Sequence, residues 1–110
     1  MYRYRAKVIS VYDGDTIRCD IDLGFGIWMR DQTIRLYGIN TPELRGDDKE
    51  AGLAARDWLR EKVLGFDIQI LTHKDKKGKY GRWLGTLFDG GISINQEMID
   101  RGYAVPYLLD

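Results

Sequence analysis

The polar residues that could do chemistry lie in three short segments, each of which mixes charged side chains with turn residues. The segments are residues 11–17, 34–43 and 79–84. Carboxylate, amide and carbonyl oxygens are the ligands that hard cations such as calcium prefer. The planar guanidinium of arginine holds the oxygens of a phosphate in a way that lysine cannot copy. The three segments together contain both kinds of group.

The first segment places Asp13 and Asp15 on either side of Gly14. Asp-Gly is common turn chemistry, and most such triplets bind nothing. Oxygen ligands two residues apart on a turn can also converge on a calcium ion, although the full spacing of an EF-hand is absent. Both interpretations stay open for this segment taken alone.

The other two segments have equally ordinary interpretations when each residue is taken singly. Arg35, at a polar position of a predicted strand, is typical of a solvated arginine, and so is Arg82 beside its lysine neighbours. Glu43, which follows Thr41 and Pro42, fits an exposed loop. Only their combination indicates a site.

Composition excludes several classes of protein. The chain has 110 residues, which predicts a single domain over residues 1–110, and its 17 basic and 17 acidic residues give zero formal net charge. A polyanion site must therefore be local, because no bulk positive charge attracts nucleic acid or a membrane. One cysteine and one histidine exclude an internal disulfide and a Cys/His zinc site. Without a membrane span or a signal peptide in view, we expect a cytoplasmic monomer that does not bind membranes, although a processed secreted form would look the same.

The elements that must position these segments are mostly strands. Apolar residues alternate from Tyr4 to Val8 and then shift phase at Ile9, which indicates a bulge. Alternation returns at residues 17–21, 34–37, 66–70 and 82–88. Residues 51–63 instead follow a helical period, and Ile94, Met98 and Ile99 suggest a short second helix. The order predicts a mainly β, α+β fold: a five-stranded oligonucleotide/oligosaccharide-binding (OB) barrel with a helix between strands three and four and a short C-terminal helix.

Finer signals predict where these helices begin and end. Asp47, followed by Glu50 three residues later, predicts a capping box before the first helix, and Gly65 predicts its end. Ser93 or Asn95 is expected to cap the second helix. His73 is expected to lie in a charged loop that continues to Lys79.

Taken together, the segments resemble the staphylococcal nuclease-like (thermonuclease) family over nearly the whole chain and in the family's order. The matching blocks are Asp-Gly-Asp-Thr-Ile at 13–17, Arg-Leu at 35–36, Gly-Ile-Asn-Thr-Pro-Glu at 38–43, Lys-Tyr-Gly-Arg at 79–82, Ile-Asn at 94–95 and Gly-Tyr-Ala at 102–104. The Thr-Pro-Glu and Tyr-Gly-Arg blocks are the most specific. The fold that the resemblance implies is the same barrel.

The resemblance implies a calcium-dependent nuclease that hydrolyses DNA and/or RNA with little sequence preference and leaves 3′-phosphate ends. By position, Asp15, Asn40 and the Thr41 carbonyl would be metal ligands. Glu43 would be the general base, and Arg35 and Arg82 would bind the phosphate. These residue types suit the reaction, because hydrolysis needs an oriented water and stabilisation of charge on the phosphate oxygens.

One residue departs from the family pattern. Asn40 stands where the family commonly has Asp, and an amide oxygen brings no negative charge. Calcium affinity follows ligand charge, so we expect weaker metal binding than with Asp at this position. Asp13 is a candidate to compensate, or it only shapes the turn.

The resemblance also implies that Lys79, Tyr80 and Tyr107 contact the substrate, at its terminal phosphate and near the sugar or base. Aromatic stacking tolerates any base, which fits an enzyme without sequence preference. Tyr107 also fits ordinary packing. The alternative to an enzyme is an OB-fold module that binds nucleic acid with weak or no catalysis. Since Arg35, Glu43 and Arg82 are all retained, the sequence favours the enzyme.

Overall fold

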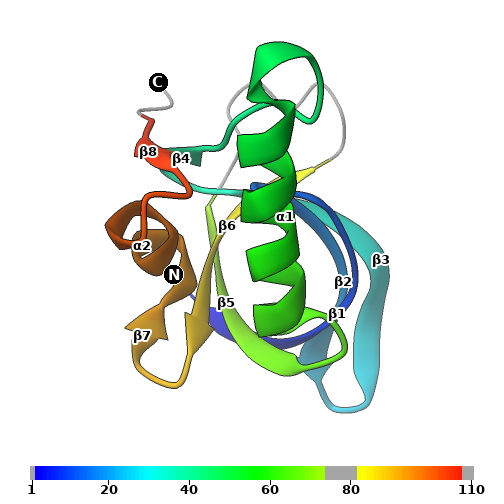
Figure 1. The fold of residues 1–110 in the computed structure, drawn as a ribbon. Coiled ribbons are helices and arrows are strands. Elements are labelled where there is room, and N and C mark those ends of the chain that lie inside the picture. Colours follow the sequence, from blue (N-terminus) through cyan, green and yellow to red (C-terminus); the bar gives the residue numbers. More distant parts are fainter. Residues whose placement is uncertain (1, 74–81, 108–110) are drawn as a thin grey trace.

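The computed structural model describes residues 2–73 and 82–107 and shows a closed β-barrel crossed by one long helix (Figure 1). The strands of the barrel are β1 (Arg3–Asp13), β2 (Thr16–Gly24), β3 (Ile27–Leu36), β5 (Asp67–His73) and β6 (Trp83–Asp89). The helices are α1 (Lys49–Val63) and α2 (Ile94–Asp100), with a short 3₁₀ turn at Gly46–Asp48 before α1. The predicted OB-like α+β fold is confirmed.

The sheet is antiparallel in the order β3-β2-β1-β5-β6, and a short parallel pairing of β3 with β6 closes the barrel. β6 also pairs with β7 (Ile92–Ser93). A separate two-stranded sheet joins β4 (Ile39–Asn40) to β8 (Val105–Pro106). The closure matters for function, because it puts Arg35 on β3 directly beside Leu84 on β6.

Strand alternation places the core as the sequence predicts. The inward residues of the strands pack against the buried face of α1, which consists of Gly52, Ala55, Leu59 and Val63. The predicted bulge is present, since the register between β1 and β2 shifts between Val8 and Ser10. None of the helices in the described ranges is long and apolar enough to cross a membrane.

Two boundary predictions are wrong, and each has a physical reason. The predicted capping box does not form: the 3₁₀ turn moves the N-cap of α1 to Asp48, whose side chain makes no capping hydrogen bond. His73 lies not in a loop but at the end of β5, because it pairs with Leu84 and continues the ladder between β5 and β6. Ser93 caps α2 as predicted, accepting a hydrogen bond from the Gln96 N–H.

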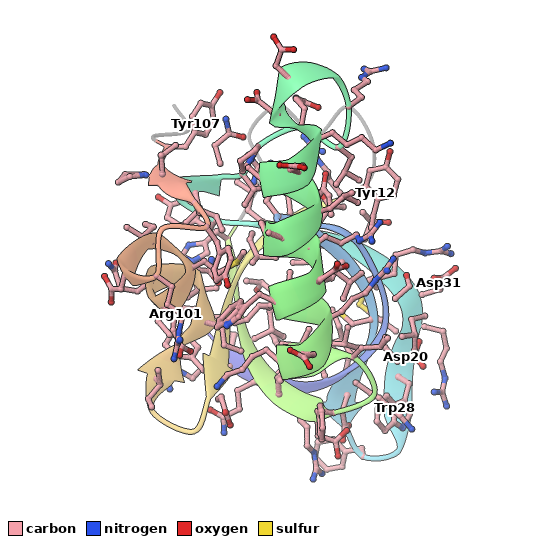
Figure 2. All side chains as sticks on the ribbon, viewed as in Figure 1. Tyr12, Asp20, Trp28, Asp31, Arg101 and Tyr107 are labelled. Carbon is pink, nitrogen blue, oxygen red and sulfur yellow. The ribbon has the colours of Figure 1, made fainter. Side chains whose placement is uncertain are left out.

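The two ends of the molecule differ in what they expose. One end holds the N-terminal end of α1, the β4–β8 pair and the turn between β1 and β2. The β2–β3 hairpin forms the opposite end (Figure 1). Tyr12 and Tyr107 lie at the first end and Trp28 at the second (Figure 2). The described blocks at 13–17 and 38–43 begin or lie at the first end.

Candidate active site

Asp15 is the centre of the site and is almost fully buried, with 8% of its surface exposed. It lies in the two-residue turn between β1 and β2. Its Oδ2 atom accepts hydrogen bonds from the backbone N–H of Thr41 (3.2 Å) and from the Thr41 hydroxyl (3.1 Å). Its Oδ1 atom accepts one from the Thr16 hydroxyl at 3.2 Å. The carboxylate therefore ties the first predicted segment to the second.

Arg35 is buried as well, with 9% of its surface exposed, so its interpretation as a solvated arginine is wrong. The closure of the barrel by β6 covers its strand position, which alternation within β3 alone does not reveal. Nη1 donates to the carbonyls of Leu36 and Ile39, both at 3.0 Å. The same atom lies 3.6 Å from Asp15 Oδ2. Two backbone carbonyls and one carboxylate thus orient the guanidinium.

Asn40 completes this group. Its Oδ1 atom lies 3.5 Å from Arg35 Nη2, at the long limit for a hydrogen bond. Asn40 is exposed, whereas Thr41 is 8% exposed. The structure therefore brings together four sequence-predicted residues, namely Asp15, Arg35, Asn40 and Thr41. We call them the Asp15 network.

The donor set of the Asp15 network fits calcium in kind. The predicted set consists of the Asp15 carboxylate, the Asn40 amide oxygen and the Thr41 carbonyl. All three are hard oxygen donors, and the set contains no nitrogen or sulfur donor. Among the described residues no three side chains of His, Cys, Asp or Glu gather at one point. A cation here would thus be held by a mixed set with little negative charge.

Asp13 is the second carboxylate near the site. Its Oδ1 atom accepts a hydrogen bond from the backbone N–H of Asp15 at 3.0 Å, which shapes the turn. Burial, reinforced by the hydrogen bond and negative charge of Asp15, raises the pKa of Asp13 to about 6. The two carboxylates therefore repel each other at neutral pH, and a bound cation would relieve that repulsion.

Glu43 differs from the Asp15 network because its side chain is exposed. Within the described parts of the chain its carboxylate makes no hydrogen bond or ion pair. It lines a groove of about 280 Å³ together with Asn40, Thr41 and Asp48 on one side and residues 102–105 on the other. Its position comes from its backbone: a Cβ atom built on Gly52 of α1 would lie 2.3 Å from the Glu43 carbonyl oxygen.

The remaining predicted residues lie around this group. Arg82 directly precedes Trp83, which pairs with Ile34, so its backbone lies beside β3 close to Arg35. The Tyr107 ring lies 5.9 Å from the Arg35 guanidinium, and the Tyr107 N–H donates to the Gly38 carbonyl at 2.8 Å. Lys79 and Tyr80 lie outside the described residues.

Two features of this region were missed at the level of sequence. The rings of Tyr37 and His73 stack with their centroids 4.1 Å apart and an interplanar angle of 15°. Burial lowers the pKa of His73, which keeps its ring neutral at pH 7.

The second feature is Asn95, which is buried. Its side chain accepts a hydrogen bond from the Leu87 N–H and donates to the carbonyls of Tyr37 and Gly85. A polar residue among the apolar positions of a predicted helix was the available signal for Asn95.

The chain is similar to known proteins over most of its length. A family model described as "Staphylococcal nuclease homologue" matches residues 33–109. The chain is 30% identical over 101 residues to a thermonuclease of Staphylococcus hyicus, covering 89% of this chain and 56% of that protein. It is 29% identical over 100 residues to a thermonuclease of Staphylococcus intermedius, with 88% and 56% covered. An uncharacterised protein of Bacillus anthracis is 30% identical over 105 residues, with 92% and 46% covered. The chain thus spans about half the length of these relatives.

Proposed function

Because the chain belongs to the family of staphylococcal nuclease homologues, we propose that it is a calcium-dependent nuclease that hydrolyses DNA or RNA with little sequence preference. The observation that carries the proposal is the convergence of a buried carboxylate and a buried arginine beside an exposed glutamate. Asp15 and Arg35 contact each other, and Asn40 and Thr41 join them to the groove that Glu43 lines.

Arg35 is placed to hold the phosphate. Nη1 is already engaged by the Leu36 and Ile39 carbonyls, which fixes the plane of the guanidinium. The Nη2 edge faces Asn40 through one long contact and can donate to phosphate oxygens. Arg82 would supply the second guanidinium, and preorganised donors of this kind stabilise the charge of the transition state.

Glu43 would act on the attacking water. In the proposed reaction a water oxygen forms a bond to phosphorus, and Glu43 accepts the water proton. The bond to the 5′ oxygen breaks, and that oxygen leaves with the bonding electron pair and takes a proton from solvent water. An exposed carboxylate with no partner in the described residues is free to accept that proton. Calcium held by Asp15, Asn40 and the Thr41 carbonyl would neutralise and orient a phosphate oxygen.

A cleavage assay tests the proposal. A labelled single-stranded DNA is incubated with the wild type in calcium and then in chelator, and the same is done with Glu43→Gln. We expect calcium-dependent cleavage that falls by about 10²–10⁴-fold in the variant. Glu50→Gln is the matched control, since Glu50 is an exposed glutamate in the first turn of α1.

The opposite result defines the alternative. Binding of the oligonucleotide without cleavage, in calcium and in the other divalent cations tried, would overturn the enzyme and support a nucleic-acid-binding module. The amide at position 40 makes this outcome worth testing, because it leaves the Asp15 network with a single carboxylate.

A further inference from the structure

The stacked rings of Tyr37 and His73 form a surface that the phosphate chemistry does not use. The rings come from different elements, since Tyr37 follows β3 and His73 ends β5. One face of Tyr37 is covered by His73, yet Tyr37 keeps 40% of its surface exposed. An aromatic ring that is supported on one face and still partly exposed to solvent is the kind of surface on which a nucleobase stacks.

Hydrogen bonds hold the backbone of Tyr37 and the ring of His73, on which the Tyr37 ring stacks. The Tyr37 N–H donates to the Gly85 carbonyl at 2.8 Å, and the Tyr37 carbonyl accepts from the buried Asn95 side chain at 2.9 Å. His73 Nε2 lies 3.2 Å from the Thr86 hydroxyl. A ring fixed in this way loses little conformational entropy when a ligand packs on it.

The position of the rings relative to Arg35 follows from strand register. Arg35 pairs with Leu84 in the parallel ladder, and Leu84 pairs with His73 in the antiparallel ladder. His73 is therefore two strands away from Arg35, roughly 10 Å at the usual strand spacing. Tyr37 is two residues after Arg35, and its N–H donates to the Gly85 carbonyl of β6. The strand pairing therefore continues past the end of β3, and the two side chains lie on the same face of the sheet.

We propose that the Tyr37–His73 stack is a binding subsite for a base of single-stranded nucleic acid, next to the nucleotide whose phosphate Arg35 holds. This inference rests on the proposed function, because Arg35 supplies the phosphate contact that sets the register. The paired bases of a duplex do not offer a free face to such a ring, so the subsite selects single strands. Stacking reads no base edge, so it adds affinity without sequence preference.

The test measures binding separately from cleavage. All variants are made in the Glu43→Gln background, and binding of a fluorescent single-stranded oligodeoxynucleotide is followed by anisotropy. Tyr37→Ala is expected to weaken binding by about 5- to 100-fold, the range for loss of one base–aromatic stack. Tyr37→Phe keeps the ring and is expected to stay within about twofold of the Glu43→Gln background. Phe25→Ala is the control, because Phe25 is fully exposed in the β2–β3 hairpin at the other end of the molecule.

A second arm changes the ligand in place of the protein. Abasic sites are placed one at a time along the oligonucleotide. An abasic site at one of these positions is expected to weaken binding to the protein that keeps Tyr37. The same abasic site is expected to have no effect on binding to Tyr37→Ala. Equal affinity of Tyr37→Ala and its background, or equal loss with Phe25→Ala, would overturn the subsite.

The outcomes separate the subsite from the nuclease. Cleavage by the wild type with unchanged binding of Tyr37→Ala overturns the subsite and leaves the nuclease. Tyr37-dependent binding without cleavage by the wild type overturns the nuclease and keeps the base subsite. No binding by the Glu43→Gln background overturns the subsite, and it overturns the nuclease as well where the wild type does not cleave.

Discussion

The two halves of the candidate site are built differently. Asp15 and Arg35 are about nine-tenths buried and form an ion pair. Asp15 also accepts hydrogen bonds from Thr41, and Arg35 donates to backbone carbonyls. Glu43 is exposed and has no side-chain partner in the described ranges. The first half is fixed before any ligand arrives, whereas the second is positioned only through its backbone. Stability and catalysis should therefore separate along this line.

The largest effect is expected from Asp15→Ala, which breaks the buried half. Loss of the carboxylate leaves Arg35 buried without its counter-charge and the Thr41 N–H without its acceptor. We expect a loss of about 3 kcal/mol in the free energy of unfolding and at least about 10²-fold in cleavage. Urea denaturation measures the first and the oligonucleotide assay the second.

Glu43→Gln changes the exposed half of the site and is compared with Asp15→Ala in the buried half. Its cleavage defect should come with a change in unfolding free energy within about 0.5 kcal/mol, as for other exposed substitutions. A destabilisation equal to that of Asp15→Ala would show that the two halves are one structural unit.

Gly52→Ala tests how the exposed half is held. The new Cβ atom would meet the Glu43 carbonyl oxygen at 2.3 Å, so the Glu43 backbone must move. A displacement of about 1 Å can reduce cleavage by about 10²-fold, and the strain should cost about 1–3 kcal/mol of stability. Gly91→Ala is the control, since nothing lies within 4 Å of its built Cβ. Unchanged cleavage in Gly52→Ala would mean that Glu43 is not positioned through α1.

Asn40→Asp adds charge where the two halves meet. A second carboxylate beside Asp15 should tighten calcium binding on the order of tenfold, as read by isothermal titration. The new carboxylate would also face Arg35 Nη2, which lies 3.5 Å from the present Asn40 oxygen. No gain in calcium affinity would exclude Asn40 from the ligands.

Asp13→Asn is expected to have the smallest effect, and the effect depends on pH. Because burial and Asp15 raise the pKa of Asp13 from 3.8 to about 6, the folded protein binds an extra proton between those values. Wild-type stability therefore falls as pH rises through this window and then levels off. Without divalent cations, Asp13→Asn should be more stable by about 1 kcal/mol at pH 7, after allowance for solvent screening, and no different below pH of about 4. An equal gain in the free energy of unfolding at both pH values would mean that the effect comes from changed hydrogen bonding and not from the charge of Asp13.

The sequence predicted the barrel well, because alternation along each strand reports the core directly. It also predicted the bulge after Val8 and the cap at Ser93, which depend on residues close in the chain. The capping box at Asp47 was wrong because a 3₁₀ turn intervened, and the strand position of His73 depended on pairing with Leu84. The His73 error arose where a neighbour distant in sequence decides the outcome, whereas the capping-box error came from a local turn.

The same distinction applies to the site. Residue types and order identified Asp15, Arg35, Asn40 and Thr41, and the structure brings these four together. The burial of Arg35 was not predictable from β3 alone, since β6 provides the cover. The pairing of Tyr37 with His73 needed β3 and β5 to meet across β6. The roles of these four residues stay predictions. So do the roles of Glu43, Arg82, Tyr107, Lys79 and Tyr80, as well as calcium binding, a monomeric state and a cytoplasmic location.

The anchoring of Arg35 by the Leu36 and Ile39 carbonyls has a consequence for how such a site can change over time. Main-chain oxygens persist through almost any replacement of the side chains at these two positions, so the arginine keeps its aim while the surrounding sequence drifts. Position 40 can then exchange amide for acid without disturbing that aim. The charge at position 40, and with it the metal affinity, can therefore change by mutation while the two carbonyls keep the guanidinium in its plane.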